Sequence, residues 1–245
     1  MNTDQTIAQL RKLKLHGMAD RYELMLNLSS THEPTDAHTT VAMLSEAEAI
    51  YRTQRRTDLY IKNARFRYQV NPQSVVCSPE RGLTMEQWVL LCECTFIDEC
   101  KNIIVTGPVG SGKSHLASAL GKQACLKGYK TIYHNMNRFI EELKASKLSG
   151  TYLKFLDQHA KAPLVILDDV GLKPIDSDVR IGLYEILEER MGKGSTIITS
   201  QLPISGLYDK FVDKNLAEAV LDRLTGHSEK ILMKGESWRS KRRSK

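Results

Sequence analysis

A glycine-rich segment near the middle of the chain lies between an apolar run and a stretch compatible with a helix. The segment reads Gly107, Pro108, Val109, Gly110, Ser111, Gly112, Lys113, Ser114 and His115, after the run Asn102–Thr106 and before a helical pattern that extends to Cys125. Glycine tolerates a left-handed backbone, so several N–H groups can converge on one anion at the N-terminus of the following helix. The order of strand, loop and helix therefore predicts a phosphate-binding loop rather than an accidental glycine-rich turn.

Two side chains at the end of this loop match the chemistry of a nucleoside triphosphate. Lys113 is long enough to reach the β- and γ-phosphates, and the hydroxyl of Ser114 is a ligand for Mg²⁺. We assign the cofactor-binding residues to the segment 107–115 and predict ATP and Mg²⁺ as the cofactors.

Composition and charge narrow the setting of this site. The chain has 245 residues, of which 41% are hydrophobic, and no run approaches the roughly 18–20 apolar residues that a membrane span needs. No signal-peptide pattern is evident at the start, so we expect a cytoplasmic protein. The net charge is +6, and the basic tail 238–245 contains no acid, which favours a polyanionic partner. Cys92, Cys94 and Cys100 lack the usual spacing of a zinc site, so we expect incidental thiols.

The first eighty residues read as a small helical domain. Apolar residues recur at helical spacing over residues 4–28, where Gly17 indicates a break between two short helices or a tolerated interior glycine. A third helix is predicted over residues 41–61. Proline, glycine and serine cluster between Asn71 and Gly82, so we expect a helical N-terminal domain over residues 1–75 and a second domain over 76–245.

A dense group of basic residues ends this helical region. The group comprises Arg52, Arg55, Arg56, Lys62, Arg65 and Arg67, against the single acid Asp58. The first three arginines share one face of a helix, so a continuous basic stripe is geometrically possible. Such a stripe suits contact with the phosphate backbone of DNA, and the alternative is a solvated helix face. We favour DNA because balancing acids are nearly absent.

Strands and helices alternate after the phosphate-binding loop. Apolar runs at 102–106, 130–134, 163–169, 195–201 and 230–234 predict strands, and the intervening segments have helical patterns. Continuous apolar strands that alternate with helices indicate an α/β fold with a parallel sheet covered on both faces. Ligands of such sheets bind at the carboxyl ends of the strands.

An acid pair ends the run 163–169. Asp168 would support Mg²⁺ directly or through water, and Asp169 is placed to act as the general base for the attacking water. A turn or helix cap is the structural alternative, but an acid pair together with a phosphate-binding loop favours hydrolysis over binding alone.

Two further positions are candidates with open alternatives. Ser200 and Gln201 end the next strand, where they are either γ-phosphate contacts or ordinary turn residues. Arg223 lies on an amphipathic helix beside Asp222, so it is either an ion-pair partner or an arginine finger for a neighbouring subunit.

Several of these blocks together resemble one known family. The blocks are residues 102–121, 167–171, 198–203, 221–224 and 235–239, together with residues 10–19 near the start. They are similar to the IstB family of AAA+ helper ATPases, which are encoded beside the transposase in one class of bacterial insertion sequences and are related to DnaC-type helicase loaders. The resemblance covers nearly the whole chain.

The resemblance implies roles for particular residues. Lys113 would be the Walker A lysine, Asp168 and Asp169 the Walker B pair, Gln201 the sensor 1 residue and Arg223 the arginine finger. Family members commonly have asparagine at the sensor position, so Gln201 carries the amide on a longer arm. Fewer than fifty residues follow Pro203, so the AAA+ helical lid is expected to be absent or rudimentary, with Arg239 as a candidate substitute for a lid arginine.

The resemblance also implies partners. Family members assemble into homo-oligomers on double-stranded DNA, with ATP sites between subunits, and direct a cognate transposase to its target. A DnaC-type helicase loader acting on single-stranded DNA is the main alternative, and the interleaved Tyr60, Phe66 and Tyr68 keep it open. A small-molecule kinase lacks a recognisable acceptor pocket, and a nucleotide switch without hydrolysis is a further alternative.

Overall fold

The chain forms two compact units. A computed structural model describes residues 2–28, 36–173, 175–210 and 214–235. The two units are Met1–Leu59 and Tyr60–Lys245, so the division falls within helix α3 (Ala37–Ala64) and not at the predicted boundary after residue 75. The observed division precedes the predicted one because Phe66 and Val70 are buried in the hydrophobic core of the second unit and therefore belong to that unit.

The first unit contains α1 (Thr3–Lys12), α2 (His16–Leu28) and the first part of α3. The helical conformation is interrupted between α1 and α2 near Lys14, which has a positive φ of 62°. Gly17 lies inside α2. A Cβ atom on Gly17 would lie 2.5 Å from the carbonyl oxygen of Ala47 on α3. The glycine therefore permits close helix packing, so of the two interpretations the structure shows the interior glycine, and the break between the two short helices lies near Lys14.

A buried carboxylate on α3 caps the N-terminus of α2. Glu48 Oε2 accepts hydrogen bonds from the backbone N–H groups of Gly17 and Met18 at 2.8 and 3.2 Å. Burial alone would raise the pKa of Glu48, but the hydrogen bond from Arg52 and those from the two N–H groups hold this pKa below its ordinary value. Glu48 therefore stays charged beside the positive end of the helix dipole.

The second unit is built on a five-stranded parallel sheet. Its strands are β1 (Asn102–Thr106), β2 (Thr131–Asn135), β3 (Leu164–Val170), β4 (Ser195–Ser200) and β5 (Ser228–Leu232). Their spatial order is β2-β3-β4-β1-β5, and every pairing is parallel. The predicted parallel sheet is confirmed, with strand bounds that lie within a few residues of the apolar runs.

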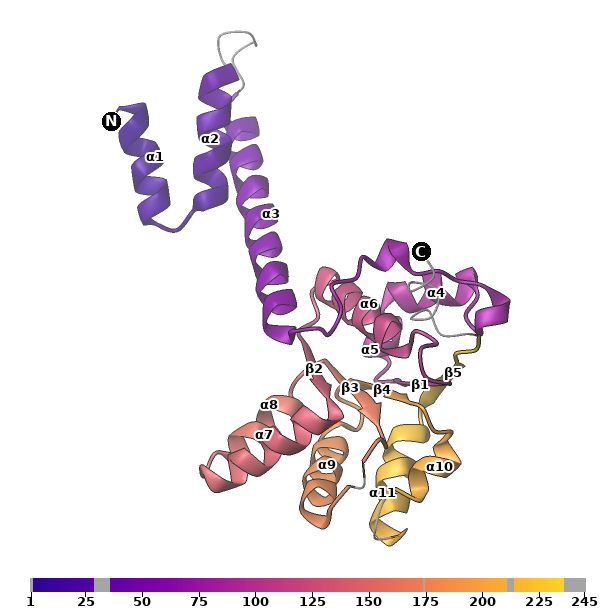
Figure 1. Cartoon of the computed structure of the whole chain (residues 1–245). Helices are drawn as coiled ribbons and strands as arrows, with labels where there is room; N and C mark the ends of the chain where they lie inside the picture. Colours follow the sequence, from indigo (N-terminus) through magenta and orange to yellow (C-terminus); the bar gives the residue numbers. More distant parts are fainter. Residues whose placement is uncertain (1, 29–35, 174, 211–213, 236–245) are drawn as a thin grey trace. The chain divides into compact units, whose positions relative to one another are not determined.

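Helices cover both faces of this sheet (Figure 1). One face carries α4 (Met85–Glu93), α5 (Thr95–Asp98) and α6 (Lys113–Leu126), preceded by short 3₁₀ turns at Pro72–Ser74 and Pro79–Arg81. The other face carries α7 (Met136–Leu148), α8 (Tyr152–Ala160), α9 (Ser177–Arg190), α10 (Ile204–Tyr208) and α11 (Lys214–Thr225). The pleat of β1 divides its side chains accordingly: Ile103 and Val105 join one hydrophobic cluster and Ile104 joins the other.

The segment after β5 returns to the end of β1. The backbone N–H of Met233 donates to the carbonyl oxygen of Thr106 at 2.7 Å, and that of Lys234 donates to the carbonyl oxygen of Arg81 at 2.8 Å. Within the described part of the chain no helix follows β5, and the basic tail with Arg239 lies outside that part. In the described ranges, no helix is both long and apolar enough to cross a membrane.

Candidate nucleotide-binding site

The glycine-rich loop joins the carboxyl end of β1 to the N-terminus of α6. Gly107, Gly110 and Gly112 have φ values of 147°, 80° and 100°. A Cβ atom on Gly107 would lie only 2.2 Å from the carbonyl oxygen of Met233, so no other residue fits there. The loop thus has the backbone conformation and the helix N-terminus that bind phosphate groups.

The lysine of this loop is folded back over it. Lys113 is buried, and its Nζ donates hydrogen bonds to the carbonyl oxygens of Gly107 and Pro108, both at 2.9 Å. From outside, Arg81 Nη2 donates to the carbonyl oxygen of Ser111 at 2.9 Å. The ammonium is therefore held within the loop, at the place where its charge can act on bound phosphates.

The first acid at the end of β3 is fixed by hydroxyl groups from both neighbouring strands. Asp168 is fully buried. Thr199 on β4 donates to its Oδ1 at 2.5 Å, and Tyr133 on β2 donates to its Oδ2 at 2.6 Å. Burial and the adjacent Asp168 carboxylate raise the pKa of Tyr133, so this tyrosine keeps its proton and remains a donor. The carboxylate is thus held in one orientation.

The second acid turns away from the strand. Asp169 has a positive φ of 63°, and the pairing of β3 with β4 shifts register between Leu167 and Val170. A non-glycine residue in this region costs of order 1–3 kcal/mol and persists where the surroundings impose it. Here the backbone N–H of Asp169 donates to Thr199 Oγ1 at 2.9 Å, and Asn135 Nδ2 donates to Asp169 Oδ2 at 3.2 Å. The side chain is 14% exposed, so it can reach a bound water.

An arginine from the segment after α3 bridges both acids. Arg67 Nη1 lies 2.6 Å from Asp169 Oδ2 and 3.3 Å from Asp168 Oδ2. Burial is the largest influence and lowers the pKa of Arg67, but the hydrogen bond to Asp169 and the charges of Tyr68, Asp169 and Asp168 together raise this pKa above its ordinary value. The sequence groups Arg67 with the DNA contacts, whereas the structure places it at the nucleotide site.

The residues at the end of β4 have different positions. Ser200 is buried, donates to the carbonyl oxygen of Val170 at 2.8 Å and accepts from the N–H of Leu202 at 3.1 Å. Gln201 follows β4 at the same edge of the sheet and is partly exposed. Its role as sensor 1 stays a prediction.

Magnesium suits the donor set of this edge. Ser114 lies in the first turn of α6 and contributes a hydroxyl, and Asp168 contributes carboxylate oxygens. Oxygen atoms of these kinds are the hard ligands that Mg²⁺ prefers. Among the described residues no group of three or more histidine, cysteine, aspartate or glutamate side chains forms another candidate metal site. Burial raises the pKa of Cys92 to about 11 and that of Cys94 to about 12, so both are neutral thiols.

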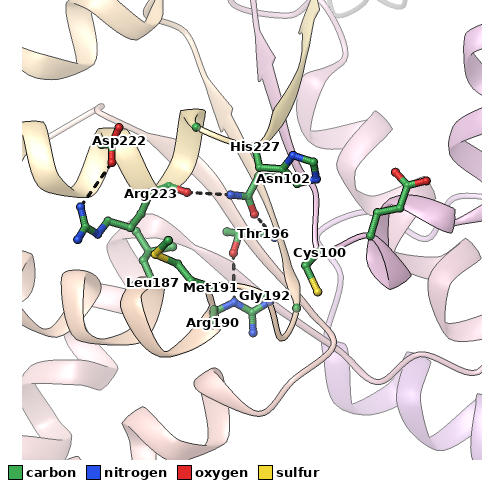
Figure 2. Close-up of a pocket in the computed structure, with 13 residues that line it drawn as sticks. Cys100, Asn102, Leu187, Arg190, Met191, Gly192, Thr196, Asp222, Arg223 and His227 are labelled. Atoms are coloured by element: carbon green, nitrogen blue, oxygen red, sulfur yellow. Dashed lines mark hydrogen bonds and ion pairs between the residues drawn. The ribbon is translucent and has the colours of Figure 1, made fainter.

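Arg223 lies at the opposite end of the sheet. Asn102, which begins β1, donates through Nδ2 to the carbonyl oxygen of Arg223 at 3.0 Å, whereas the phosphate-binding loop follows the end of β1. The guanidinium pairs with Glu188 at 2.6 Å and with Asp222 at 3.5 Å, and it lies over the ring of Tyr184. A pocket of about 350 Å³ opens beside it (Figure 2). Arg223 is therefore remote from the phosphate loop of its own chain.

The other predicted DNA contacts are exposed and divided between the two units. Arg52, Arg55 and Arg56 belong to the first unit, and Lys62 and Arg65 to the second. Arg52 pairs with Glu48 at 2.7 Å, so the stripe is better balanced than the sequence suggests. DNA binding by these residues stays a prediction.

Sequence reasoning missed three residues that contact the acid pair. Tyr133 and Thr199 lie in runs predicted as strands, and Asn135 was not singled out. In the structure Asn135 also caps α7, because its Oδ1 accepts from the N–H of Asn137. The only available signal was their position at the carboxyl ends of strands.

Comparison with known proteins decides the family. The family model described as IstB-like ATP binding protein matches residues 8–245. The chain belongs to this family. It is 34% identical over 240 residues to an insertion sequence ATP-binding protein of Sinorhizobium fredii, covering 98% of both chains. It is 29% identical over 236 residues to the ATP-binding protein of insertion sequence IS21 from Pseudomonas aeruginosa, covering 96% of this chain and 89% of the relative.

Solved structures show the same fold at low identity. DnaA from Aquifex aeolicus bound to AMPPCP superposes with a TM-score of 0.60 at 20% identity, covering 70% of this chain and 52% of DnaA. The DnaC helicase loader superposes with a TM-score of 0.55 at 21% identity, covering 68% of this chain and 98% of the loader. The IstB-like chain therefore has the AAA+ fold predicted from its sequence.

Proposed function

We propose that this IstB-like protein is an ATP-hydrolysing helper in DNA transposition that assembles on duplex DNA and directs a partner transposase. Family membership and the names of the relatives support the link to insertion sequences. The observation that carries assembly is the position of Arg223 at the amino ends of the strands, away from its own phosphate loop. An arginine finger there can act only on the nucleotide of a neighbouring subunit.

The residues of one subunit divide the work of hydrolysis. The loop N–H groups and Lys113 would bind the phosphates, while Ser114 and Asp168 would hold Mg²⁺, which neutralises phosphate charge when bound. Asp169 would accept the proton of the water that attacks the γ-phosphate. Arg223 of the neighbouring subunit would stabilise the charge that develops, an effect worth about 10³–10⁵ in rate where such fingers act.

Binding of the DNA backbone would use the exposed arginines of α3. Arg55 and Arg56 are both exposed, and Arg55 Nη1 donates to the hydroxyl of Tyr51 at 3.2 Å, which orients its guanidinium. Cations of this kind bind phosphates without reading sequence. A helicase loader would share the ATP site, and the structural likeness to DnaC keeps it as the second candidate.

One assay separates the candidates. ATP hydrolysis is measured without DNA, with long duplex DNA and with single strands, while light scattering records assembly size. Stimulation by duplex DNA together with ATP-dependent growth of the complex is expected. Stimulation by single strands alone would favour the helicase loader, and turnover indifferent to both would exclude DNA as the activator. Transposase recruitment is tested separately, by co-sedimentation with a candidate cognate transposase.

A further inference from the structure

Arg67 is held firmly at the nucleotide site by its sequence neighbours. Phe66 is buried, and its ring lies 5.9 Å from that of Tyr133 in an edge-on arrangement. The same ring lies where a Cβ atom on Gly121 of α6 would be 2.5 Å away, so the glycine admits it. On the other side, the guanidinium carbon of Arg67 lies 5.5 Å from the ring centre of Tyr68. The arginine is thus positioned by packing and does not merely reach in from solvent.

The charge around the acid pair makes this arginine unusual. The donors from Thr199 and Tyr133 to Asp168 are neutral hydroxyls, and the donor from Asn135 to Asp169 is a neutral amide. In the described part of the chain, Arg67 is the cation that forms ion pairs with these two carboxylates. It contacts Oδ2 of each, so it occupies one carboxylate oxygen of each acid.

We propose that Arg67 is a positioning residue that partly neutralises the acid pair before Mg²⁺ and ATP bind, and that it sets the Mg²⁺ concentration the site requires. This inference rests on the ATP site of the proposed function. Mg²⁺ and the guanidinium compete for the same carboxylate charge, because both are cations and the two acids supply only two negative charges. While Arg67 holds Asp169 Oδ2, that oxygen is also unable to accept a proton from water. Release of Arg67 therefore prepares both the metal site and the general base.

Two other roles for Arg67 predict a different effect of its removal on the Mg²⁺ requirement of nucleotide binding. If Arg67 remained in place and stabilised the γ-phosphate, its removal would weaken nucleotide binding and leave the Mg²⁺ requirement unchanged or higher. If it only stabilised the fold, its removal would lower thermal stability without changing that requirement in the folded protein. Metal dependence of binding, and not turnover, therefore distinguishes these roles.

The test is a titration of binding with Mg²⁺. Binding of a fluorescent ATP analogue to the full chain is followed by anisotropy as Mg²⁺ is raised, for the wild type and for Arg67→Gln. Arg67→Gln is expected to lower the half-saturating Mg²⁺ concentration by about threefold to tenfold, because it removes a partly exposed, charge-assisted competitor. Arg67→Lys, which keeps the charge without the planar fork, is expected to shift it by less.

Control variants show whether a change in the Mg²⁺ requirement is specific to the contact of Arg67 with the acid pair. Arg138→Gln is matched, because it breaks an arginine–carboxylate ion pair of 2.7 Å with Glu142 on the surface of α7, and it should leave the Mg²⁺ requirement unchanged. In an Asp169→Asn background, Arg67→Gln should have a smaller effect. An unchanged or raised requirement in Arg67→Gln and Arg67→Lys would overturn the inference, whereas failure of the wild type to bind the analogue would overturn the ATP site itself.

Discussion

The hydroxyl of Thr199 donates a 2.5 Å hydrogen bond to Asp168 and ties the end of β4 to the acid that ends β3. The same oxygen accepts the backbone N–H of Asp169. One threonine therefore satisfies the buried carboxylate and fixes the turn that presents the second acid. The two acids are positioned as a unit.

Thr199→Val should destabilise the second unit by about 1–3 kcal/mol, because it removes a donor from a buried carboxylate. It should also weaken Mg²⁺-dependent nucleotide binding, since Asp168, the proposed Mg²⁺ ligand, loses a donor that orients it. Urea denaturation and nucleotide titration measure both effects. Thr199→Ser keeps the hydroxyl and should therefore retain most of the stability and affinity. If Thr199→Val matched the wild type in both measurements, the hydroxyl would not hold the acid pair in place.

Lys113→Ala should weaken ATP binding by about thirtyfold or more, which corresponds to about 2 kcal/mol for lost charge-assisted contacts with phosphate. Stability should change little, because the substitution also removes a buried ammonium. Isothermal titration measures the affinity, and Lys122→Ala on the same helix is the control. Unaltered affinity would mean that the glycine-rich loop does not bind the nucleotide.

Arg223→Ala should leave ATP binding intact and reduce turnover of the assembly by about 10³-fold or more. Its ion pair with Glu188 is on the surface, so folding should be preserved. Arg223→Ala mixed with Lys113→Ala should recover part of the turnover, because one supplies the phosphate loop and the other the finger. Absence of recovery in mixed assemblies would favour a purely structural ion pair.

Arg55→Gln and Arg56→Gln should each reduce the slope of log affinity for duplex DNA against log salt by about 0.9. Arg52 is left unchanged in this test, because it pairs with the carboxylate that caps α2. Binding to a labelled duplex at several salt concentrations gives the slope. If the slope is that of the wild type, the DNA lies on another surface.

Two buried histidines predict a pH dependence of stability. The Nε2 atoms of His134 and His159 lie 2.8 Å apart, and His159 Nδ1 donates to the carbonyl oxygen of Phe155 at 2.7 Å. Because His159 Nδ1 carries the proton, its Nε2 accepts from His134 when both rings are neutral. Burial lowers the pKa of both histidines, and the neighbouring His159 lowers that of His134 further.

Below about pH 6.5, these two histidines therefore bind more protons in the unfolded chain than in the folded chain. The contribution of the pair is complete above the ordinary histidine pKa of about 6.5 and is lost as the pH falls below it. Stability should fall by about 1 kcal/mol per pH unit between pH 6 and 5 on account of His134, and His159 should add a loss in the same direction. Urea denaturation of the wild type and His159→Gln measures this slope. The exposed His38→Gln serves as control, and identical slopes in all three would exclude the pair as the cause.

Local patterns were sufficient for the sheet and the phosphate loop. The runs that became β1 and β3 are apolar because both faces of a parallel sheet are buried, and the three loop glycines are required by positive φ values. Asp168 and Asp169 were found because they follow such a run. These features depend on neighbours in the sequence.

The remaining parts of the site depend on distant segments. Arg67 and Asp168 are 101 residues apart, and nothing in a basic cluster distinguishes the arginine that turns inward from those that face solvent. The two interpretations of Gly17 could not be separated, and the unit boundary was placed too late, because close helix packing and burial of Phe66 are tertiary effects.

The sheet order has a consequence for synthesis on the ribosome. β1 pairs with β4 on one side and β5 on the other, and both emerge long after the phosphate loop. A nascent chain that ends before β4 has no neighbouring strand for β1. A chain that ends before Met233 also lacks the backbone segment whose carbonyl oxygen lies beside Gly107. We therefore expect nucleotide binding only after translation has passed β5, so that ATP would not guide the earlier steps of co-translational folding.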